Sequence, residues 1–442
     1  MDDQVHDRPQ GPDDDGPQSR PGSMSAGQAA GSEPGRAAAA GASGAAAHGP
    51  AGPGPGEVSH TGPAGDHARP ARRRGLTIPF EGFDAVELPM HRELFQHALA
   101  AGYTDLWSSE TNGSDGLTPL ALASVWAPDA RLGSAILPVH TRGPALLAMS
   151  AAALAEAAPG RFVLGIGASS PAIVQRWNGI AFDQPFGRVR DTLRFLRRAL
   201  AGQKVDEQFP TFTVRGFRLG RPPRVAPPIL LAALRPAMIR LGVREGDGII
   251  TNWLGAGDVP QVVAEMRKAQ QDAYRAGAAE VAGLSGAGEL AGAGDGADRH
   301  AAFAPKELAA RIFVCPTEDA EYARGLGRMM ISGYLTVPAY AEFHRWLGRG
   351  DALGPMWDAW AAGDRKKANE LIPDEVVDAL LVHGTPDQCR AHVDRYADAG
   401  IDTAILALLP TPELGAVQAA SKGEAQVRYL AEVISALAPT GE

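Results

Sequence analysis

The residues best suited to chemistry follow short apolar runs that resemble β-strands. Glu110 and Thr111 come after one such run, and His140 and Arg142 come after the next. A carboxylate at a strand end can bind a ring N–H or hold a proton, so Glu110 and Thr111 are candidate catalytic residues. Glu110 could equally cap a helix, and a lone histidine such as His140 is more often structural than catalytic.

A glycine-rich turn follows a fourth run and leads directly into a helical segment. Such a turn leaves backbone N–H groups free at the positive end of a helix, which suits a phosphate. It is not a dinucleotide fingerprint, because a serine stands where the third glycine should be. An equally compatible interpretation is that Gly165 and Gly167 only let the strand pass close to its neighbours. The candidate cofactor-binding residues here are Gly167, Ala168, Ser169 and Ser170.

A fifth run ends in small residues and brings an arginine to the same edge. Small side chains permit close approach of a ligand, and an arginine can pair with its anionic groups. Taken alone, a solvent-facing arginine in a connecting segment is the simpler interpretation. The candidates are Ala233, Leu234, Arg235 and Pro236. The sequence contains no metal-ligand spacing and no Gly-x-Ser-x-Gly elbow, so we expect neither a metal site nor serine-esterase chemistry.

Strand-like runs alternate with helical patterns from Leu76 onward, which is typical of parallel βαβ units. The eight runs are Leu76–Phe80, Thr104–Ser109, Leu132–Pro138, Arg161–Gly167, Ile229–Ala233, Gly248–Asn252, Leu308–Val314 and Thr403–Leu409. Eight strands, each followed by a helix, predict a (β/α)8 TIM barrel with its active site at the C-terminal ends of the strands. A doubly wound open sheet is the competing arrangement.

Several segments have sequence features that predict their local structure. Residues 385–388 predict a capping box with proline at the first helical position, and the helix should end at Gly400. Residues 277–304 are rich in Gly and Ala without periodicity, which predicts a flexible surface insertion. Aromatic-rich helical patches between Gly333 and His383 predict a helical insertion before the last strand.

The first part of the chain differs from the rest in composition. Residues 1–75 are dominated by Gly, Ala, Pro, Asp and Ser, which predicts a disordered tail before a domain spanning 76–438. We interpret Arg72 to Arg74 as a solvated linker. A net charge of −9 argues against nucleic-acid binding, and no apolar run approaches the ~20 residues that cross a bilayer. The two cysteines, far apart in sequence, favour a reducing cytoplasm.

The motifs taken together resemble the luciferase-like, deazaflavin-dependent oxidoreductases of actinobacteria. The similarity covers most of Leu76 to Ala438 and depends on the order and spacing of individually weak motifs. The segments that carry it are Trp107 to Glu110, Arg142-Gly143-Pro144, Leu164 to Pro171 with Trp177-Asn178-Gly179, Arg235 to Met238, Gly246-Asp247-Gly248, Thr251-Asn252-Trp253 and Gly384 to Asp387.

The resemblance implies where a cofactor would bind. A ring of the isoalloxazine type would lie across the barrel mouth beside an acid matching Glu110, against a non-proline cis peptide matching Ala135 and Ile136. The turns matching Ala168-Ser169 and Leu234 to Ala237 would hold the cofactor's tail, and Thr251 and Asn252 would bind substrate. Two departures are that Thr111 stands where some relatives have a proton-donating histidine, and Ser170 where they have a proton-accepting glutamate.

These features predict an oxidoreductase that transfers a hydride between coenzyme F-420 and a small organic substrate. An FMN-dependent luciferase-like monooxygenase that uses oxygen is the alternative. A barrel that has lost catalysis and acts as a binding protein is the alternative from another class, supported by the missing histidine and glutamate. We expect a cytoplasmic protein and a homodimer, whereas the substrate and the direction of transfer stay open.

Overall fold

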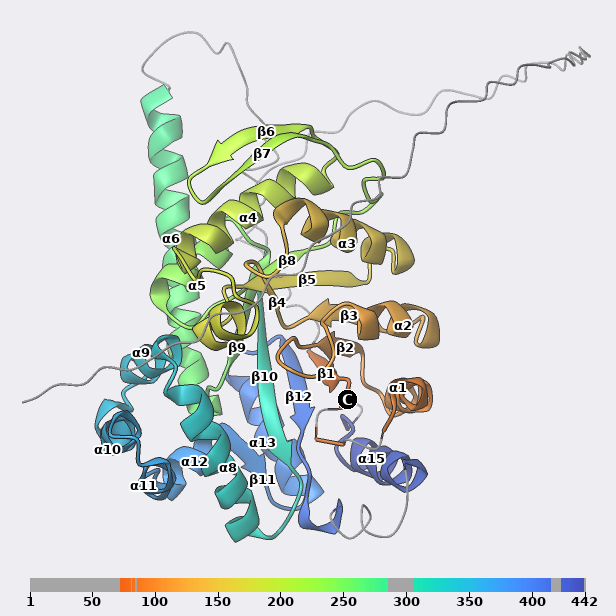
Figure 1. Ribbon diagram of the computed structural model, residues 1–442, viewed down its shortest axis with the longest axis vertical. Helices are drawn as coiled ribbons and strands as arrows, with labels where there is room; N and C mark the ends of the chain where they lie inside the picture. Colours follow the sequence, from red (N-terminus) through yellow and green to blue (C-terminus); the bar gives the residue numbers. More distant parts are fainter. Residues whose placement is uncertain (1–71, 81, 84–85, 285–304, 415–422, 441–442) are drawn as a thin grey trace, which may run out of the picture. The chain divides into compact units, whose positions relative to one another are not determined.

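The computed structural model describes residues 72–80, 82–83, 86–284, 305–414 and 423–440. Its centre is a closed ring of eight parallel strand positions, drawn in Figure 1. In ring order the strands are β1 (Arg73–Ile78), β2 (Asp105–Ser108), β3 (Arg131–Ser134) continued by β4 (Leu137–Pro138), β5 (Phe162–Gly167), β8 (Ile229–Ala232), β9 (Gly248–Asn252), β10 (Glu307–Cys315) and β12 (Thr403–Leu408). Because β12 pairs with β1 and β10 pairs with β9, the ring closes. The (β/α)8 prediction is confirmed, and the open sheet is excluded.

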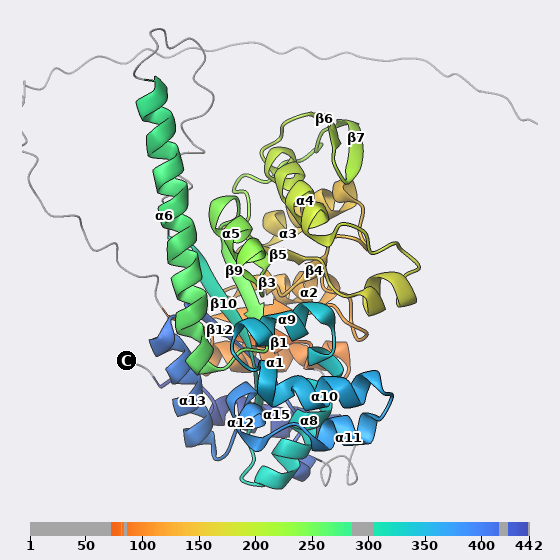
Figure 2. The same cartoon turned by 90° about the vertical axis from the view of Figure 1, so that its left-hand side faces the viewer.

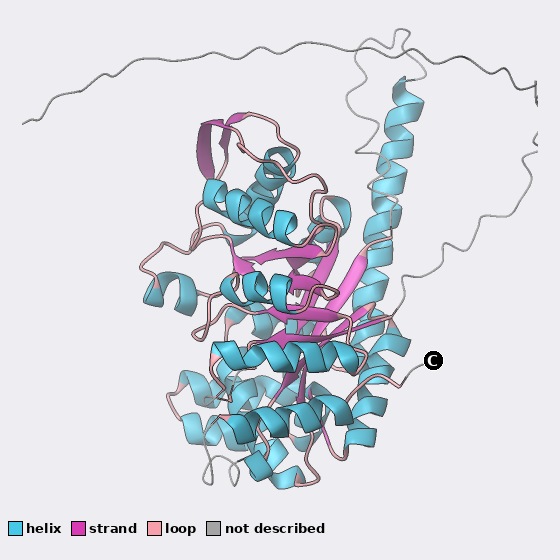
Figure 3. Cartoon of the chain, turned by 90° about the vertical axis from the view of Figure 1, so that its right-hand side faces the viewer, coloured by secondary structure: helices cyan, strands magenta, loops and turns pink. Residues whose placement is uncertain are grey.

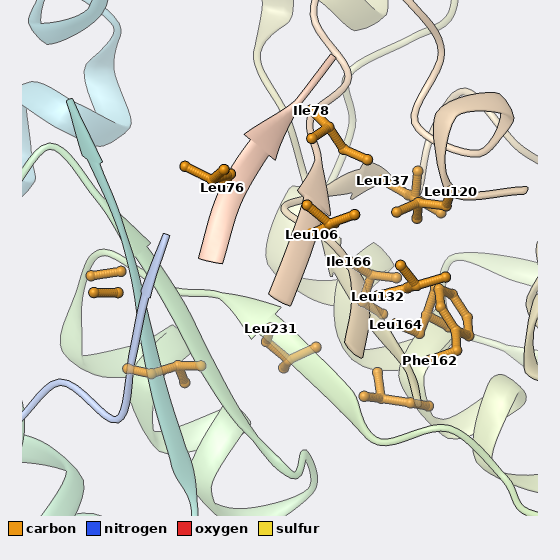
Figure 4. Close-up of a cluster of buried hydrophobic side chains, with 14 of the residues drawn as sticks. Leu76, Ile78, Leu106, Leu120, Leu132, Leu137, Phe162, Leu164, Ile166 and Leu231 are labelled. Atoms are coloured by element: carbon orange, nitrogen blue, oxygen red, sulfur yellow. The ribbon is translucent and has the colours of Figure 1, made fainter. Parts of the chain in front are cut away.

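Alternate residues of each strand contribute to two separate cores. Side chains such as Leu76, Leu106 and Leu231 face the surrounding helices, and Figure 4 shows ten labelled members of this outer core. The interior of the ring is filled by a second set: Trp107, Val163, Leu230, Ile250, Ala309 and Ile405. Burial on both faces explains why the strands read as near-continuous apolar runs.

The interior depends on one large side chain next to two glycines. A Cβ on Gly133 would lie 2.2 Å from Cε3 of Trp107, and one on Gly75 would lie 2.9 Å from its Cδ1. The indole of Trp107 therefore occupies the space that side chains on the two flanking strands would need. Nothing in the spacing of Trp107 along the sequence indicated this role.

Helices surround the ring, as the cyan and magenta elements of Figure 3 show. They are α1 (His91–Ala100), α2 (Thr118–Trp126), α3 (Pro144–Ala157), α4 (Pro185–Leu200), α5 (Pro236–Arg244), α6 (Val259–Leu284), α8 (Ala320–Leu335), α13 (Pro386–Ala399) and α15 (Glu424–Ala436). Proline stands in the first turn of α2, α3, α4, α5 and α13, where its missing N–H costs no hydrogen bond. The predicted capping box is confirmed, with Thr385 and Gln388 capping each other and Gly400 ending α13.

A helical insertion precedes the last strand, as predicted. It consists of α9 (Pro338–Trp346), α10 (Gly350–Ala361), α11 (Arg365–Glu370), α12 (Asp374–Leu380) and the short strand β11 (Leu381–His383). Figure 2 shows these helices grouped beside α8. Their buried side chains form a core of their own that includes Phe313 of β10 and Ala407 of β12, so the insertion is anchored to the ring.

A β-hairpin that the sequence did not predict follows α4. Its strands are β6 (Val205–Phe209) and β7 (Phe212–Phe217), which pair only with each other among the described strands. Phe195 of α4 makes edge-on contacts with Phe209 and Phe212, at ring-centroid distances of 6.4 and 6.3 Å. The hairpin thus extends the outer core and takes no part in the ring.

Two boundary predictions need correction, and one lies outside the described residues. Helix α6 continues to Leu284, so the first eight residues of the expected insertion at 277–304 are helical, in keeping with their alanine content. Arg72 to Arg74 are not a solvated linker: Arg73 and Arg74 begin β1, and the three form ion pairs with Asp398, Asp105 and Asp394 respectively. The expected disordered tail before them falls outside the described residues.

Candidate functional site

The C-terminal ends of β3, β5 and β8 meet at one place on the rim of the barrel. A Cβ on Gly167 would lie 2.7 Å from Cβ of Ala232 and 3.0 Å from Cδ1 of Ile136. Since β5 pairs in parallel with β8, the turn after Gly167 and the turn that carries Arg235 leave neighbouring strands at the same end. Gly167 is buried, and the closeness of Ala232 and Ile136 shows that only a glycine fits at this junction without displacing a neighbour.

The peptide bond between Ala135 and Ile136 is cis, as the resemblance implied. It lies between β3 and β4, and both side chains are partly buried and pack against the interior cluster around Trp107. On one side of it Ala135 N donates to Ser108 O at 2.6 Å, and on the other Val139 N donates to Gly167 O at 2.9 Å. The bulge is therefore tied to β2 and to β5 at the level where the ring opens.

The two glycines of the glycine-rich turn have different surroundings. A Cβ on Gly165 would lie 1.9 Å from the carbonyl oxygen of Ser134, and the Ser134 hydroxyl bonds both backbone groups of Gly165, so this glycine serves close packing of strands. Gly167 instead borders the rim. The next residues, Ala168, Ser169 and Ser170, are half-buried.

Ser169 takes the strained position in this turn. Its φ is 67°, a left-handed conformation that side chains other than glycine rarely adopt. Ser170 then accepts from Val174 N through its carbonyl (2.9 Å) and from Ile173 N through its hydroxyl (3.4 Å), which starts the short π-helix Ala172–Trp177. A serine in place of the third glycine is therefore compatible with a sharp turn.

The turn after β8 presents backbone and an exposed cation. Ala233 N donates to Ile250 O at 2.9 Å, which places the turn beside β9. Leu234 packs on the outer core, and Arg235 is the N-cap residue of α5, with Pro236 at the first helical position. The Arg235 side chain is exposed and makes no ion pair with any residue in the described ranges.

Glu110 is already occupied by neighbours. Its Oε1 accepts from Nη1 of Arg142 at 2.5 Å, and its Oε2 accepts from Gly116 N at 2.8 Å. The side chains of Glu110 and Arg142 are each 14% exposed. Thr111, the other predicted catalytic residue, is half-buried beside them. The sequence placed Arg142 at the end of the third strand-like run, but its pairing with Glu110 was not predicted.

Thr251 and Asn252 differ in what they face. Ile249 belongs to the outer core and Ile250 to the interior, so alternation turns Thr251 outward and Asn252 inward. Thr251 is 1% exposed and does not open into the mouth. Asn252 Nδ2 donates to the hydroxyl of Tyr340 on α9 at 3.1 Å, and burial raises the pKa of Tyr340 to about 12, so that hydroxyl stays neutral.

His140 packs behind the glycine-rich turn. Its ring lies 5.1 Å from that of Phe182, and Nε2 is 3.4 Å from the carbonyl oxygen of Asp183. Burial lowers the pKa of His140, and the nearby Arg188 lowers it further. A neutral imidazole held against a loop agrees with the structural interpretation of this residue.

Two further polar side chains face the interior without having been predicted. Thr77 of β1 lies opposite Trp107 of β2 in the sheet. Both point into the barrel, as does the Cα of Gly75, two residues before Thr77. Within the described part of the chain, Thr77 Oγ1, Trp107 Nε1 and Asn252 Oδ1 are buried atoms that lack a hydrogen-bond partner. Buried polar atoms are rarely left unsatisfied, and Thr77 and Asn252 lie near the C-terminal ends of β1 and β9, so their unpartnered oxygens are candidate contacts for a ligand or water. The sequence signal available for Thr77 was the alternation of side chains along a strand, because Thr77 stands two residues after Gly75.

A protein-family model described as luciferase-like monooxygenase matches residues 73–403, well over half of the chain. The chain belongs to this luciferase-like family. The match spans the ring from β1 to the first residue of β12, together with every rim residue described above.

Curated relatives of this luciferase-like protein are oxidoreductases by name. A putative coenzyme F-420-dependent oxidoreductase of Mycobacterium tuberculosis is 27% identical over 336 residues, which is 70% of this chain and 88% of the relative. A methylenetetrahydromethanopterin reductase of Methanolobus tindarius is 26% identical over 308 residues, covering 68% of this chain and 84% of the relative.

Solved structures share the fold. The coenzyme F-420-dependent tetrahydromethanopterin reductase of Methanopyrus kandleri matches with a TM-score of 0.59 at 17% identity, over 83% of this chain and 97% of that one. An F-420-dependent secondary alcohol dehydrogenase matches with a TM-score of 0.58 at 15% identity, over 83% and 99%. Among the described helices of the luciferase-like chain, none combines the length and the apolar character needed to span a bilayer.

Proposed function

We propose that this enzyme transfers a hydride between coenzyme F-420 and a small organic molecule. The observation that carries the proposal is the junction at the rim, where the cis peptide of Ala135 and Ile136, the bare backbone of Gly167 and the small side chain of Ala232 adjoin. The name of the Mycobacterium tuberculosis relative, 88% of whose length this chain covers, supports the choice of cofactor.

The residues present fit a flat ring with hydrogen-bonding edges. Gly167, next to Ala232 and Ile136, adds no side chain where a planar group would approach, and the unpartnered Thr77 Oγ1 and Asn252 Oδ1 offer it polar contacts from other strands of the barrel. The backbone of Ala168 and Ser169 and the exposed Arg235 suit a negatively charged tail, because oriented N–H groups and a guanidinium both favour anions.

Each group of residues would have its own task in this mechanism. Ala135 and Ile136 would support one face of the ring, and Gly167 to Ser170 together with Ala233 to Pro236 would hold the tail. Asn252, fixed by Tyr340, would orient the substrate. The bound deazaflavin supplies the hydride chemistry, whereas the chain supplies position and a site that excludes water. Thr111 is the hydroxyl available beside Glu110, and proton transfer by a histidine or glutamate of the kind described in some relatives does not apply here.

The chain's other expected properties stay part of the proposal. We propose that residues 76–438, together with the first residues of β1, form the catalytic unit. We also propose that this unit acts as a homodimer. The homodimer is supported by exposed apolar side chains on the neighbouring helices α2 and α3, namely Val125, Leu146 and Met149.

The cofactor assignment is tested by titrating the purified protein with coenzyme F-420 and, separately, with FMN. We expect the fluorescence of the deazaflavin to change with saturation at micromolar concentration or below, and FMN to bind at least ~10-fold more weakly, since a tenfold ratio needs only about 1.4 kcal/mol of preference. Tight binding of FMN alone, with oxygen uptake by the reduced form, would establish the monooxygenase instead. Binding of neither would leave a barrel without catalysis.

A further inference from the structure

Both oxygens of the Glu110 carboxylate already accept a hydrogen bond from the protein. One oxygen accepts from the guanidinium of Arg142 and the other from the backbone N–H of Gly116. The carbonyl of Gly116 in turn accepts from the Ser108 hydroxyl at 2.6 Å, so the loop after β2 folds back onto its own strand. Charge-assisted bonds of this kind are among the strongest in proteins, so they hold the Glu110 carboxylate in one place.

The partner of Glu110 lies at the far end of the segment that begins with the cis peptide. That segment runs from Ala135 through β4 to Arg142, just before α3. At its start Ala135 N is bonded to Ser108 O, and at its end Arg142 is bonded to Glu110, two residues after Ser108. The bulge is therefore fastened to the end of β2 at both of its ends.

We infer that Arg142 is a positioning residue that sets the place of the Ala135–Ile136 bulge, with Glu110 as its anchor and not as a proton carrier. The inference rests on the proposed function, because the bulge matters for catalysis only if a cofactor ring lies on it. With both side chains 14% exposed, the ion pair is shielded from solvent, and removing one partner leaves the other charge buried. Loss of this ion pair would release the segment that is proposed to contact the ring of the cofactor.

The free protein provides the first test, by hydrogen–deuterium exchange of the peptide that covers residues 131–142. In Arg142→Gln we expect this peptide to exchange ~10-fold faster or more, because the amides of Ala135 and Val139 lose their fixed geometry. Arg142→Lys keeps a cation and should restore much of the protection. The matched control is Arg240→Gln, which breaks the Arg240–Glu265 ion pair (2.7 Å) between α5 and α6 and should leave this peptide unchanged.

The second test uses the bound deazaflavin. For Arg142→Gln we expect ~10-fold weaker binding or more, with an altered visible circular-dichroism band, because small displacements of a positioning group are costly. Glu110→Gln should weaken binding in the same way, since the amide NH2 must face one of two donors, Gly116 N–H or the Arg142 guanidinium. The pH–rate profile of Glu110→Gln should keep its acidic limb, whereas a proton-carrying glutamate would lose it.

The outcomes separate the two ideas. Unchanged exchange in Arg142→Gln, or loss of the acidic limb in Glu110→Gln alone, overturns the positioning role of Arg142. Failure of the unmodified protein to bind coenzyme F-420 overturns the proposed function. The exchange experiment on the free protein still tests whether the Arg142–Glu110 ion pair positions the segment.

Discussion

Breaking the ion network at the N-terminal end of the barrel should destabilise the protein strongly. Arg131 of β3 reaches across the ring and binds both oxygens of Glu307 on β10, at 2.8 and 2.5 Å, and also Asp105 on β2 at 3.1 Å. Asp105 is fully buried, and Arg131 and Glu307 are 16% and 17% exposed. The guanidinium carbon of Arg131 also lies over the Trp107 ring, 5.5 Å from its centroid, so Arg131→Met removes this contact as well as the cation that two carboxylates share.

The expected cost follows from these partners. Breaking a buried ion pair by removing one member destabilises a protein by about 3–5 kcal/mol, because the remaining charge stays desolvated. Asp105 keeps Arg73 and Glu307 keeps the hydroxyl of Thr403, so we expect the lower half of that range. Replacing both ends, in Arg131→Met/Glu307→Leu, should recover most of the loss, since apolar residues of similar volume often substitute for a buried pair without penalty.

The effect should depend on pH with a definite sign. Burial alone would raise the pKa of Glu307, but the hydrogen bonds and charge of Arg131, helped by Thr403, hold that pKa below its ordinary value of 4.5. A carboxyl whose pKa is lowered by folding stabilises the protein above 4.5 and loses that contribution as the pH falls through the lowered value.

Urea unfolding followed by circular dichroism and tryptophan fluorescence measures both effects. At pH 7 the free energy of unfolding of Arg131→Met should fall by about 3 kcal/mol, and the gap to the unmodified protein should narrow below pH 4.5. A loss under about 1 kcal/mol, or a double variant no more stable than the single one, would refute the reasoning.

Two other substitutions test the rim and the scaffold separately. Gly167→Ala should keep the fold but weaken deazaflavin binding ~10-fold, because its Cβ would lie 2.7 Å from that of Ala232 and 3.0 Å from Ile136; Gly113→Ala, where nothing lies within 4 Å, is the control in the same fluorescence titration. Thr385→Ala should lower the free energy of unfolding by about 1 kcal/mol in urea, because it removes the acceptor for Gln388 N, whereas Thr385→Ser should retain it; equal stability of the two variants would contradict the capping role.

Local patterns in the sequence were enough to predict the ring. The strands are buried on both faces, so they appear as apolar runs, and turn residues separate them from helices with clear starts such as Pro386. The β6–β7 hairpin was missed because its strands are only partly apolar. In β6 only Val205 and Phe209 are buried, and the charged Asp206 and Glu207 lie between them. The helical part of 277–304 was missed because alanine and glycine carry no periodicity.

The site was less accessible to prediction, because its contacts join distant segments. Glu110 and Arg142 are 32 positions apart, so their pairing depends on how β2 and β3 come together in the barrel. A short motif can mark a glycine such as Gly167, but it cannot distinguish Gly165, which packs against Ser134, from its neighbour at the rim. Distances across the barrel were needed for that distinction.

The network of Arg131, Glu307, Asp105 and Thr403 lies at one end of the strands, and the cis peptide and the glycine-rich turn lie at the other. Loops at the mouth can therefore be exchanged or lengthened without disturbing the charges that fasten the ring shut. A scaffold secured in this way tolerates experiments with new substrates, in the laboratory as in evolution, because the bonds that keep it whole are remote from the bonds that decide what it accepts.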